Sequence, residues 1–520
     1  MLTIFQRHII QKTSRSSFPY STMSSSTAKT SASSIETSFK PAPKLVASDL
    51  NPHALNAKYA VRGKIPTKAE QLRQELASKS HSLPFNKIIN ANIGNPQQLD
   101  QKPLTFYREI LAILQYPELL KKDAASEIFP ADIIDHSKTL LSHIGSLGAY
   151  SHSQGVAHVR KSVAEFISKR DGYEASADDI FLTAGASTAV SYLLGLLSLG
   201  PKTGFLIPIP QYPLYTATLA LNNSTALPYY LNESDNWSVD SDELVKVIEN
   251  AKAKGVSPRC LVLINPGNPT GAILKKEAIA DLLTVAAKYG LVVIADEVYQ
   301  ENVYKGEFVS VKKVLKELQS LDKQGIYSNV QLASLHSTSK GISGECGQRG
   351  GYMELVNFDD SVRAQVMKLA SISLCPPVSG QALVELMVNP PKKGDPSYEL
   401  YIKERTFIFN SLKERSRLLY AAFNEMEGVS CQEPEGAMYC FPNIELSQKV
   451  YEAAEKVGME PDEFYCSELL DNTGICAVPG SGFGQVDGTW HVRTTFLAPG
   501  TEWIGAWRDF HAKFVAKYNK

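Results

Sequence analysis

The central part of the chain alternates short apolar runs with longer helical segments, and this alternation limits the folds that it can adopt. In the clearest unit, apolar runs at 260–265 and 291–296 flank a segment at 275–289 that has helical character. Continuous apolar runs are typical of strands buried on both faces of a parallel sheet, and such strands need a crossover, which is almost always right-handed. The pattern therefore predicts an α/β fold in which helices cover a mostly parallel sheet.

The region before this alternation has a different character. Prolines are frequent between 41 and 103, where we expect an extended arm, a helix near 67–80 and a strand at 87–93. That strand ends in Gly94-Asn95-Pro96, where a glycine permits close approach of the backbone to a ligand.

The region after the alternation also changes. A proline-rich stretch at 389–396 precedes a long helical segment at 398–426, and short alternating segments follow at 437–441 and 490–496. These segments suggest a smaller α+β domain. We predict four parts: a targeting or disordered segment (1–40), an N-terminal arm with part of the small domain (41–103), a large domain (104–390) and a C-terminal small domain (391–520).

Composition excludes several classes of partner. The formal net charge of -1 provides no global field that would recruit nucleic acid or an anionic membrane, and no apolar run approaches the roughly 20 residues that span a bilayer. The seven cysteines are an odd number without a CxxC pair or a His/Cys metal spacing. We therefore expect reduced, mostly buried thiols in an intracellular compartment and no metal site.

The first 35 residues contain no Asp or Glu but carry four basic residues among many Ser and Thr. Apolar residues near the start can share one face of a short helix with Arg7 and Lys12. This composition is typical of a mitochondrial transit peptide, which would direct the protein to the matrix. A disordered polar tail is the alternative. Met23 offers a second start, so a cytosolic form is a further expectation.

Three motifs carry candidate chemistry. The first, NPGNPTG at 265–271, follows a predicted strand, and its prolines and glycines indicate a rigid turn that presents Asn268. The second, ADEVY at 295–299, places Asp296 at the end of the next strand, and ligands bind at such strand ends in α/β sheets. The third, STSKGISGECGQRGGY at 337–352, sets Lys340 among hydroxyl residues and five glycines. Alone, this third stretch fits a mobile surface loop equally well.

Together these residues match what pyridoxal 5'-phosphate (PLP) requires of a protein. Lys340 supplies the amine for a Schiff base with the cofactor. Asp296 supplies a carboxylate that keeps the pyridine nitrogen protonated, because an opposite charge favours the charged form. Asn268 and Tyr299 supply donors for the phenolic oxygen.

The three motifs in this order resemble those of the fold-type I PLP-dependent aminotransferases, and the third in its full form resembles the alanine aminotransferase subgroup. The resemblance covers roughly residues 45–520. It implies a large domain with a mostly parallel seven-stranded sheet, a smaller α+β domain, PLP as cofactor, and a homodimer with a shared active site.

The resemblance also implies a role for each matching residue. Lys340 would carry the cofactor and move the substrate proton, with Asp296 and Tyr299 as the other catalytic residues. Arg493, Gly94 and Asn268 would bind the substrate, with Arg493 clamping its α-carboxylate. The implied cofactor contacts are the ring contacts Tyr212, Asn268, Asp296 and Tyr299, the phosphate ligands Ser337, Ser339, Arg349, Ala186, Ser187 and Thr188, and Tyr150 reaching the phosphate of the partner subunit.

Some of these residues have structural alternatives. Tyr212 could be a core aromatic and Arg493 a surface cation. We expect Cys346 to be a packed thiol and His336 to have a hydrogen-bonded packing role. The glycine-rich stretch at 480–484 lacks the strand and acid of a dinucleotide site, so we predict a loop that folds over the active site ahead of Arg493.

The predicted reaction is L-alanine + 2-oxoglutarate = pyruvate + L-glutamate, by a ping-pong mechanism. Aminotransfer to glyoxylate or from other amino acids is one alternative. A PLP lyase of the aminocyclopropane-carboxylate synthase type shares most of these residues, and a non-catalytic PLP-binding paralogue or regulator is a third possibility.

Overall fold

The computed structural model describes residues 43–59, 63–78, 81–122 and 124–519. The chain divides at residue 50 into two units. The described part of the first unit contains one short 3₁₀ helix, Ala47–Asp49, and everything below concerns the second unit. The predicted transit peptide at 1–40, with the second start at Met23, lies outside the described residues.

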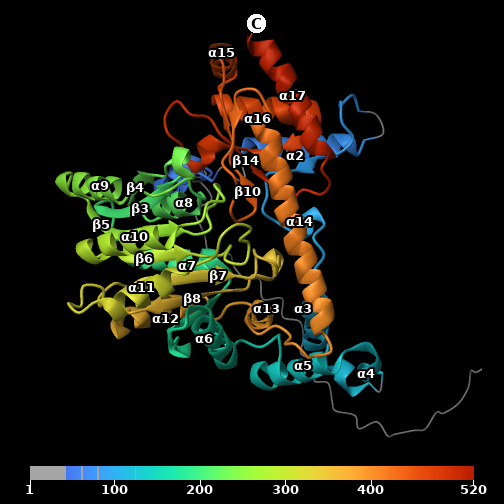
Figure 1. Cartoon of the computed structure of the whole chain (residues 1–520), viewed down its shortest axis with the longest axis vertical. Helices are drawn as coiled ribbons and strands as arrows, with labels where there is room; N and C mark the ends of the chain where they lie inside the picture. The colour runs from blue at the N-terminus through green and yellow to red at the C-terminus, as the bar shows by residue number, and fades with distance from the viewer. Residues whose placement is uncertain (1–42, 60–62, 79–80, 123, 520) are drawn as a thin grey trace, which may run out of the picture. The chain divides into compact units, whose positions relative to one another are not determined.

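A seven-stranded sheet forms the centre of the second unit, in the order β2-β8-β7-β6-β5-β3-β4 (Figure 1). All neighbouring strands are parallel except at β8, which runs antiparallel to β2 and β7. The predicted α/β fold with a mostly parallel seven-stranded sheet is thus confirmed. The strands are β2 (Ile180–Thr183), β3 (Thr203–Ile209), β4 (Thr225–Tyr230), β5 (Ser257–Ile264), β6 (Val292–Asp296), β7 (Leu332–Ser337) and β8 (Gly351–Val356).

Helices cover both faces of this sheet, because its strands are apolar on both sides. One face packs against α7 (Ala186–Leu197), α8 (Leu214–Leu221) and α12 (Asp360–Ile372). The other face packs against α9 (Ser241–Ala253), α10 (Lys276–Tyr289) and α11 (Val311–Leu321), and, under β2 and β8, against α6 (Ala157–Asp171) and α13 (Val378–Val388).

Local sequence explains where these helices begin and end. Asp240 begins α9 by accepting from the N–H groups of Asp242 and Glu243, and Asp359 caps α12 in the same way. Gly290 ends α10 with φ +65°, a conformation that glycine adopts without strain. The predicted strand-helix-strand unit therefore appears as β5, α10 and β6, and β5 and β6 pair in parallel.

A second hydrophobic core contains residues from the N-terminal and the C-terminal parts of the unit's sequence. The long helix α14 (Tyr398–Asn424), predicted at 398–426, contacts α3 (Thr105–Gln115), β10 (Tyr439–Cys440) and α17 (Glu502–Asn519). The same core includes residues of α2 (Lys64–Leu76) and α5 (Ala131–Ile144). The unit also contains α1 (Pro52–Asn56), α4 (Ala125–Ile128), α15 (Gln448–Lys456), α16 (Pro461–Thr473), β9 (Val429–Ser430), β11 (Asn443–Ile444), β12 (Ile475–Cys476), β13 (Val478–Pro479) and β14 (Val492–Thr495).

The strand predicted at 87–93 is much shorter than expected. It is reduced to β1 (Ile89–Asn90), which pairs in parallel with the two residues of β12. The prediction overestimated its length because residues 93–95 leave the ladder and line a cavity instead. Among the described residues, no helix is both long and apolar enough to cross a bilayer.

Candidate active site

The carboxyl ends of three neighbouring parallel strands, with the turns that follow them, bring Asn268, Asp296 and Lys340 to one cavity. The strands are β5, β6 and β7, whose carboxyl ends meet at the same edge of the sheet. The cavity has a volume of about 470 Å³, and all three side chains line it. Asn268 and Asp296, which the sequence places after and at the end of neighbouring strands, thus line the same cavity.

The turn after β5 is tightly held. The peptide bonds before Pro266 and Pro269 are cis, and the Gly267 N–H donates to the Ala272 carbonyl at 2.8 Å. Gly271 has φ +74°, and a Cβ there would lie 3.1 Å from the Gly436 carbonyl oxygen, so glycine fits this position best. The turn leaves Asn268 buried, with its amide nitrogen 3.5 Å from the Tyr299 hydroxyl.

Asp296 ends β6 with one oxygen held and one open. The Tyr215 hydroxyl donates to Oδ2 at 2.8 Å, whereas Oδ1 is buried and finds no partner among the described residues. Burial raises the pKa of the Asp296 carboxyl, and the Tyr215 hydroxyl, the Val298 N–H and the charge of Lys340 oppose that rise. An open carboxylate oxygen in a buried cavity is suited to a cationic or N–H-bearing ligand.

Lys340 follows β7 and reaches across the cavity to the N-terminal part of the unit. Its Nζ donates to the Gly94 carbonyl at 2.5 Å, and it forms no ion pair with a carboxylate among the described residues. A Cβ on Gly94 would lie 1.9 Å from the Tyr439 hydroxyl oxygen and 3.0 Å from Nζ of Lys340. Only glycine therefore permits this approach of the backbone to the lysine.

Arg349 and the start of α7 form a site for an anion. Arg349 donates to the hydroxyls of Ser339 at 3.2 Å and Ser187 at 3.3 Å, and to the Ala184 carbonyl at 3.0 Å. Gly185, with φ +78°, leaves the space that the guanidinium occupies, since its Cβ would lie 2.5 Å from Nη2. Ser337, Ser339, Ala186 and Ser187 line the cavity beside it. A guanidinium without a carboxylate partner among the described residues, next to a helix N-terminus, is an electrostatic site for phosphate.

Arg493 on β14 is a buried cation whose partners are all neutral. The residue is 1% exposed and lies between the rings of Tyr439 and Phe483, at 4.3 and 4.6 Å from their centroids. It donates to the Asn268 side-chain oxygen at 3.3 Å and to the Asn92 carbonyl at 2.5 Å. Within the described part of the chain it has no carboxylate partner. The alternative of a surface cation is therefore wrong.

Aromatic hydroxyls line the remaining wall. Tyr212 contacts Tyr59 edge-to-face, with ring centroids 6.0 Å apart, and the two hydroxyls are hydrogen-bonded. The Tyr299 hydroxyl donates to Tyr439 at 3.3 Å. Burial opposes ionisation of Tyr439, but the charges of Lys340 and Arg493 outweigh it and lower the pKa of Tyr439 below its ordinary value.

Two predicted residues do not line the cavity. The Thr188 hydroxyl donates to the Ala184 carbonyl at 3.3 Å within its own helix turn. Tyr150 is 79% exposed. Their predicted roles at the phosphate remain predictions.

Three further expectations have different outcomes. His336 is buried as expected, but neither ring nitrogen has a hydrogen-bond partner among the described residues; its ring packs edge-on against Tyr352. The hydrogen-bonded role predicted for it is therefore wrong. Cys346 is only partly buried and lines the cavity, with Sγ 2.8 Å from the Ser339 carbonyl. The stretch at 480–484 contains the 3₁₀ helix Gly480–Phe483, which places Phe483 against Arg493.

Sequence reasoning missed Tyr59, Tyr215 and Tyr439. Tyr59 lies in the N-terminal arm, Tyr215 lies in the first turn of α8, and Tyr439 lies on a short strand, so none of them belongs to a motif. Their relevance comes only from contacts with Tyr212, Asp296 and Arg493. The one usable signal was the position of Tyr215, three residues after Tyr212 in the same Pro-flanked segment.

Comparison with known proteins agrees with this geometry. Residues 112–502 match the family described as "Aminotransferase class I and II". The chain is 59% identical to "Alanine aminotransferase, mitochondrial" of Saccharomyces cerevisiae, over 92% of this chain and 82% of that protein. It is 56% identical to "Inactive alanine aminotransferase" of the same yeast, over 92% and 96%.

A solved structure described as "Alanine aminotransferase from Pyrococcus furiosus" is 27% identical, with a TM-score of 0.69, over 90% of this chain and 100% of that one. The family match spans most of the sequence and includes the turns that build the cavity. The chain belongs to the class I and II aminotransferase family.

Proposed function

We propose that this protein is a PLP-dependent alanine aminotransferase, which transfers the amino group of L-alanine to 2-oxoglutarate and forms pyruvate and L-glutamate. The observation that carries the proposal is that Arg493 and Lys340 line the same cavity. Arg493 is a buried guanidinium with only neutral partners among the described residues, and Lys340 donates to a backbone carbonyl. A buried unpaired charge is costly, so its retention points to an anionic ligand that completes it.

The described residues fit PLP. Arg349, two serine hydroxyls and the start of α7 would hold the phosphate, and the unpartnered Oδ1 of Asp296 would accept a hydrogen bond from the protonated ring nitrogen. Lys340 would hold the aldehyde, Tyr212 would lie against the ring, and Asn268 with Tyr299 would donate to the phenolic oxygen. When bound, the cofactor supplies an electron sink for the pair left on the substrate when the Cα–H bond breaks.

The remaining work falls to this chain's own side chains. Arg493 binds the α-carboxylate with its planar fork, and the rings of Tyr439 and Phe483 keep that fork in one orientation. The Lys340 amine accepts the proton from Cα of the donor amino acid and, in the reverse half-reaction, returns it to Cα of the product. Asp296 would face the ring nitrogen; burial raises the pKa of its carboxyl, whereas the Tyr215 hydroxyl, which donates to it, favours the ionised form. The keto acid leaves before the second one binds, which predicts ping-pong kinetics.

Three further statements belong to the proposal. The protein forms a homodimer in which the exposed Tyr150 reaches the partner's phosphate site. Residues 1–40 direct it to mitochondria, as the names of several relatives suggest for those proteins. The chain divides into an arm (41–103), a large PLP-binding domain (104–390) and a small domain (391–520); the parallel pairing of β1 with β12 supports placing part of the arm with the small domain.

The experiment is a panel of amino donors and oxo acids with purified protein, with and without added PLP. We expect L-alanine with 2-oxoglutarate to give pyruvate at the highest kcat/KM, and glyoxylate to be a weaker acceptor. Because one close relative is named as inactive, turnover and not cofactor binding decides the question. PLP binding without turnover of any pair would refute the proposal, as would an elimination product in place of a new amino acid.

A further inference from the structure

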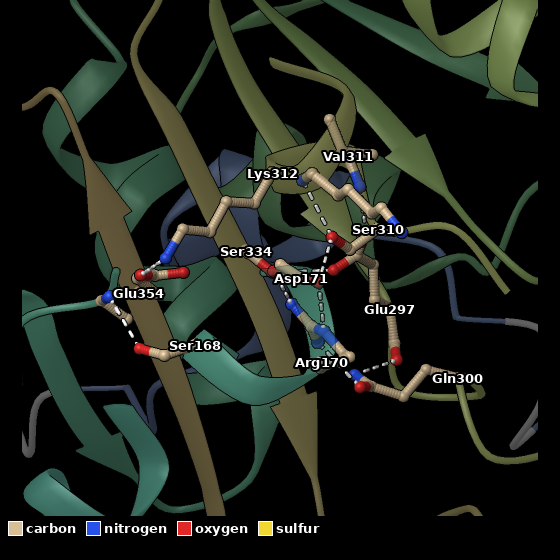
Figure 2. Close-up of polar contacts among 12 residues, drawn as sticks. Ser168, Arg170, Asp171, Glu297, Gln300, Ser310, Val311, Lys312, Ser334 and Glu354 are labelled. Carbon is tan, nitrogen blue, oxygen red and sulfur yellow. Dashed lines mark hydrogen bonds and ion pairs between the residues drawn. The ribbon is translucent and has the colours of Figure 1, made fainter. Parts of the chain in front are cut away.

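A buried polar ring lies behind the turn that carries Asp296 and Tyr299. Asp296 ends β6, the turn 297–300 follows it, and the side chains of this segment fall into two groups. Asp296, Val298 and Tyr299 line the cavity. Glu297 and Gln300 do not line it; they belong to the polar contacts drawn in Figure 2, with Val311 and Arg170. Glu297 directly follows Asp296, the last residue of β6, so contacts that fix Glu297 also restrict the backbone that carries Asp296.

Glu297 is held from two other elements. One carboxylate oxygen accepts from the backbone N–H of Val311 at 2.8 Å, and the other accepts from the Ser334 hydroxyl at 2.7 Å. The residue is fully buried. Val311 begins α11 and Ser334 lies on β7, so the carboxylate joins the end of β6 to a helix and to the neighbouring strand.

Gln300, at the other end of the turn, is held by α6. Arg170 donates to the Gln300 side-chain oxygen at 2.8 Å and makes two bonds of 2.7 Å to the carboxylate of Asp171. Asp171 in turn accepts from the Ser310 hydroxyl at 2.8 Å, and Ser310 caps α11 by accepting from the Lys313 N–H. The contacts therefore close a ring from Glu297 through the turn to Gln300, Arg170, Asp171, Ser310 and Val311 and back to Glu297.

The ring is protected from solvent and has few charged neighbours. The side chain of Asp171 is 1% exposed and that of Arg170 is 15% exposed. The titratable groups that face it are His336 from β7, Tyr352 and Glu354 from β8, and Lys312 from α11. Lys312 and Glu354 form their own buried ion pair, which makes no contact with the turn in the described part of the chain.

We propose that Glu297 and Arg170 are positioning residues for the reaction: the ring that they close holds the turn 297–300 from behind, so that Asp296 and Tyr299 face the cofactor in one geometry. Neither residue touches the cavity, and α6 contributes no residue to its lining. The inference rests on the proposed function, because it concerns the same site. Hydrogen bonds to the residues behind a binding site commonly fix the orientation of the side chains that contact the ligand.

Glu297→Ala and Glu297→Gln test the proposal together. Alanine removes both bonds of the carboxylate, whereas glutamine keeps the shape and can still bond to the Val311 N–H and the Ser334 hydroxyl. The matched control is the double variant Lys312→Met with Glu354→Gln, which removes two equally buried charges from the same layer without leaving one unpaired.

The readouts are the PLP dissociation constant of the apoprotein and the pH at which the visible absorbance of the lysine-bound cofactor titrates. For Glu297→Ala we expect weaker PLP binding by about 10- to 100-fold, the range found when supporting contacts behind a ligand are lost at metal sites. The absorbance titration should shift by about one pH unit, equivalent to a tenfold change. Glu297→Gln and the control should stay within about twofold for both quantities, even if the control unfolds at a lower temperature.

A folded Glu297→Ala variant with the PLP affinity and titration of the control would overturn the proposal. If that variant does not fold, Gln300→Leu cuts the ring at its other end and should move both readouts in the same direction by a smaller amount; unchanged readouts there would also overturn it. Wild-type protein that binds no PLP would instead refute the proposed function, so the two failures are distinguishable.

Discussion

Arg493 offers the most decisive test of the proposed site, because its role can be separated from its contribution to folding. The guanidinium has only neutral partners in the described structure and is held between two aromatic rings. If it clamps the substrate carboxylate, it makes two charge-assisted hydrogen bonds that ethylamine, the analogue of alanine without a carboxylate, cannot make.

The magnitude follows from these two bonds. Each is worth about 1.5–3 kcal/mol, so together they contribute about 3–6 kcal/mol. At about 1.4 kcal/mol for each factor of ten, Arg493→Ala should lower kcat/KM for L-alanine by about 10²- to 10⁴-fold. Arg493→Lys keeps the charge but lacks the planar fork, so its kcat/KM for L-alanine should lie between those of Arg493→Ala and the wild type.

The assay compares kcat/KM for L-alanine and ethylamine in the wild type and in both variants. The loss should be confined to alanine, since ethylamine never used the clamp, and the PLP dissociation constant should remain within about twofold. A variant that retains the wild-type preference for alanine over ethylamine would refute the clamp. A parallel loss for both substrates would show that Arg493 supports the fold or the cofactor instead.

Four further outcomes are expected. Lys340→Ala should abolish the visible absorbance of the lysine-bound cofactor, and an unchanged spectrum would contradict the assignment. Asp296→Ala should lower kcat by about 10²- to 10³-fold or more with an unchanged circular dichroism spectrum, because a preorganised charge is lost; activity near that of the wild type would disprove its role. Gly94→Ala should lower kcat/KM by about 10²-fold, because its Cβ would meet the Tyr439 hydroxyl and displace the groups around Lys340, and a wild-type value would show that this wall is free to move. Burial raises the pKa of Glu297 from its ordinary value of 4.5 to about 7. The folded state therefore binds this proton more tightly than the unfolded state, and stability falls as pH rises from about 4.5 to about 7, by up to about 3 kcal/mol. Denaturant unfolding at pH 5 and pH 8 should show a smaller difference for Glu297→Gln than for the wild type; equal differences would mean that Glu297 stays ionised throughout.

Much of the site was predictable because its chemistry is concentrated in short motifs. A lysine, a carboxylate and a guanidinium are residue types that few other contexts combine, and glycines and prolines beside them indicate where the backbone must turn. The parallel order of β5 and β6 followed from apolar runs separated by a helical segment, and that order alone implies that Asn268 and Asp296 meet at one edge.

Length and pairing of weak elements were less predictable. The strand expected at 87–93 has only two residues in the structure, because its length depends on its partner β12, which lies almost 400 residues away in the chain. His336 showed the same limit from another side. A histidine next to a polar motif suggested hydrogen bonds, but its ring packs edge-on against Tyr352, and neither nitrogen has a partner among the described residues.

The sequence by itself determined which residue types could do the chemistry and at which strand ends they stand. Only the tertiary structure decided what supports them. Lys340 is hydrogen-bonded to Gly94, which lies 246 residues away in the sequence, and Arg170 is hydrogen-bonded to Gln300, which lies 130 residues away. Local patterns carry no information about such pairs, because each contact depends on how whole helices and strands pack. Tyr215 and Arg170 lie outside the motifs, and nothing in the neighbouring sequence indicates which residues they contact.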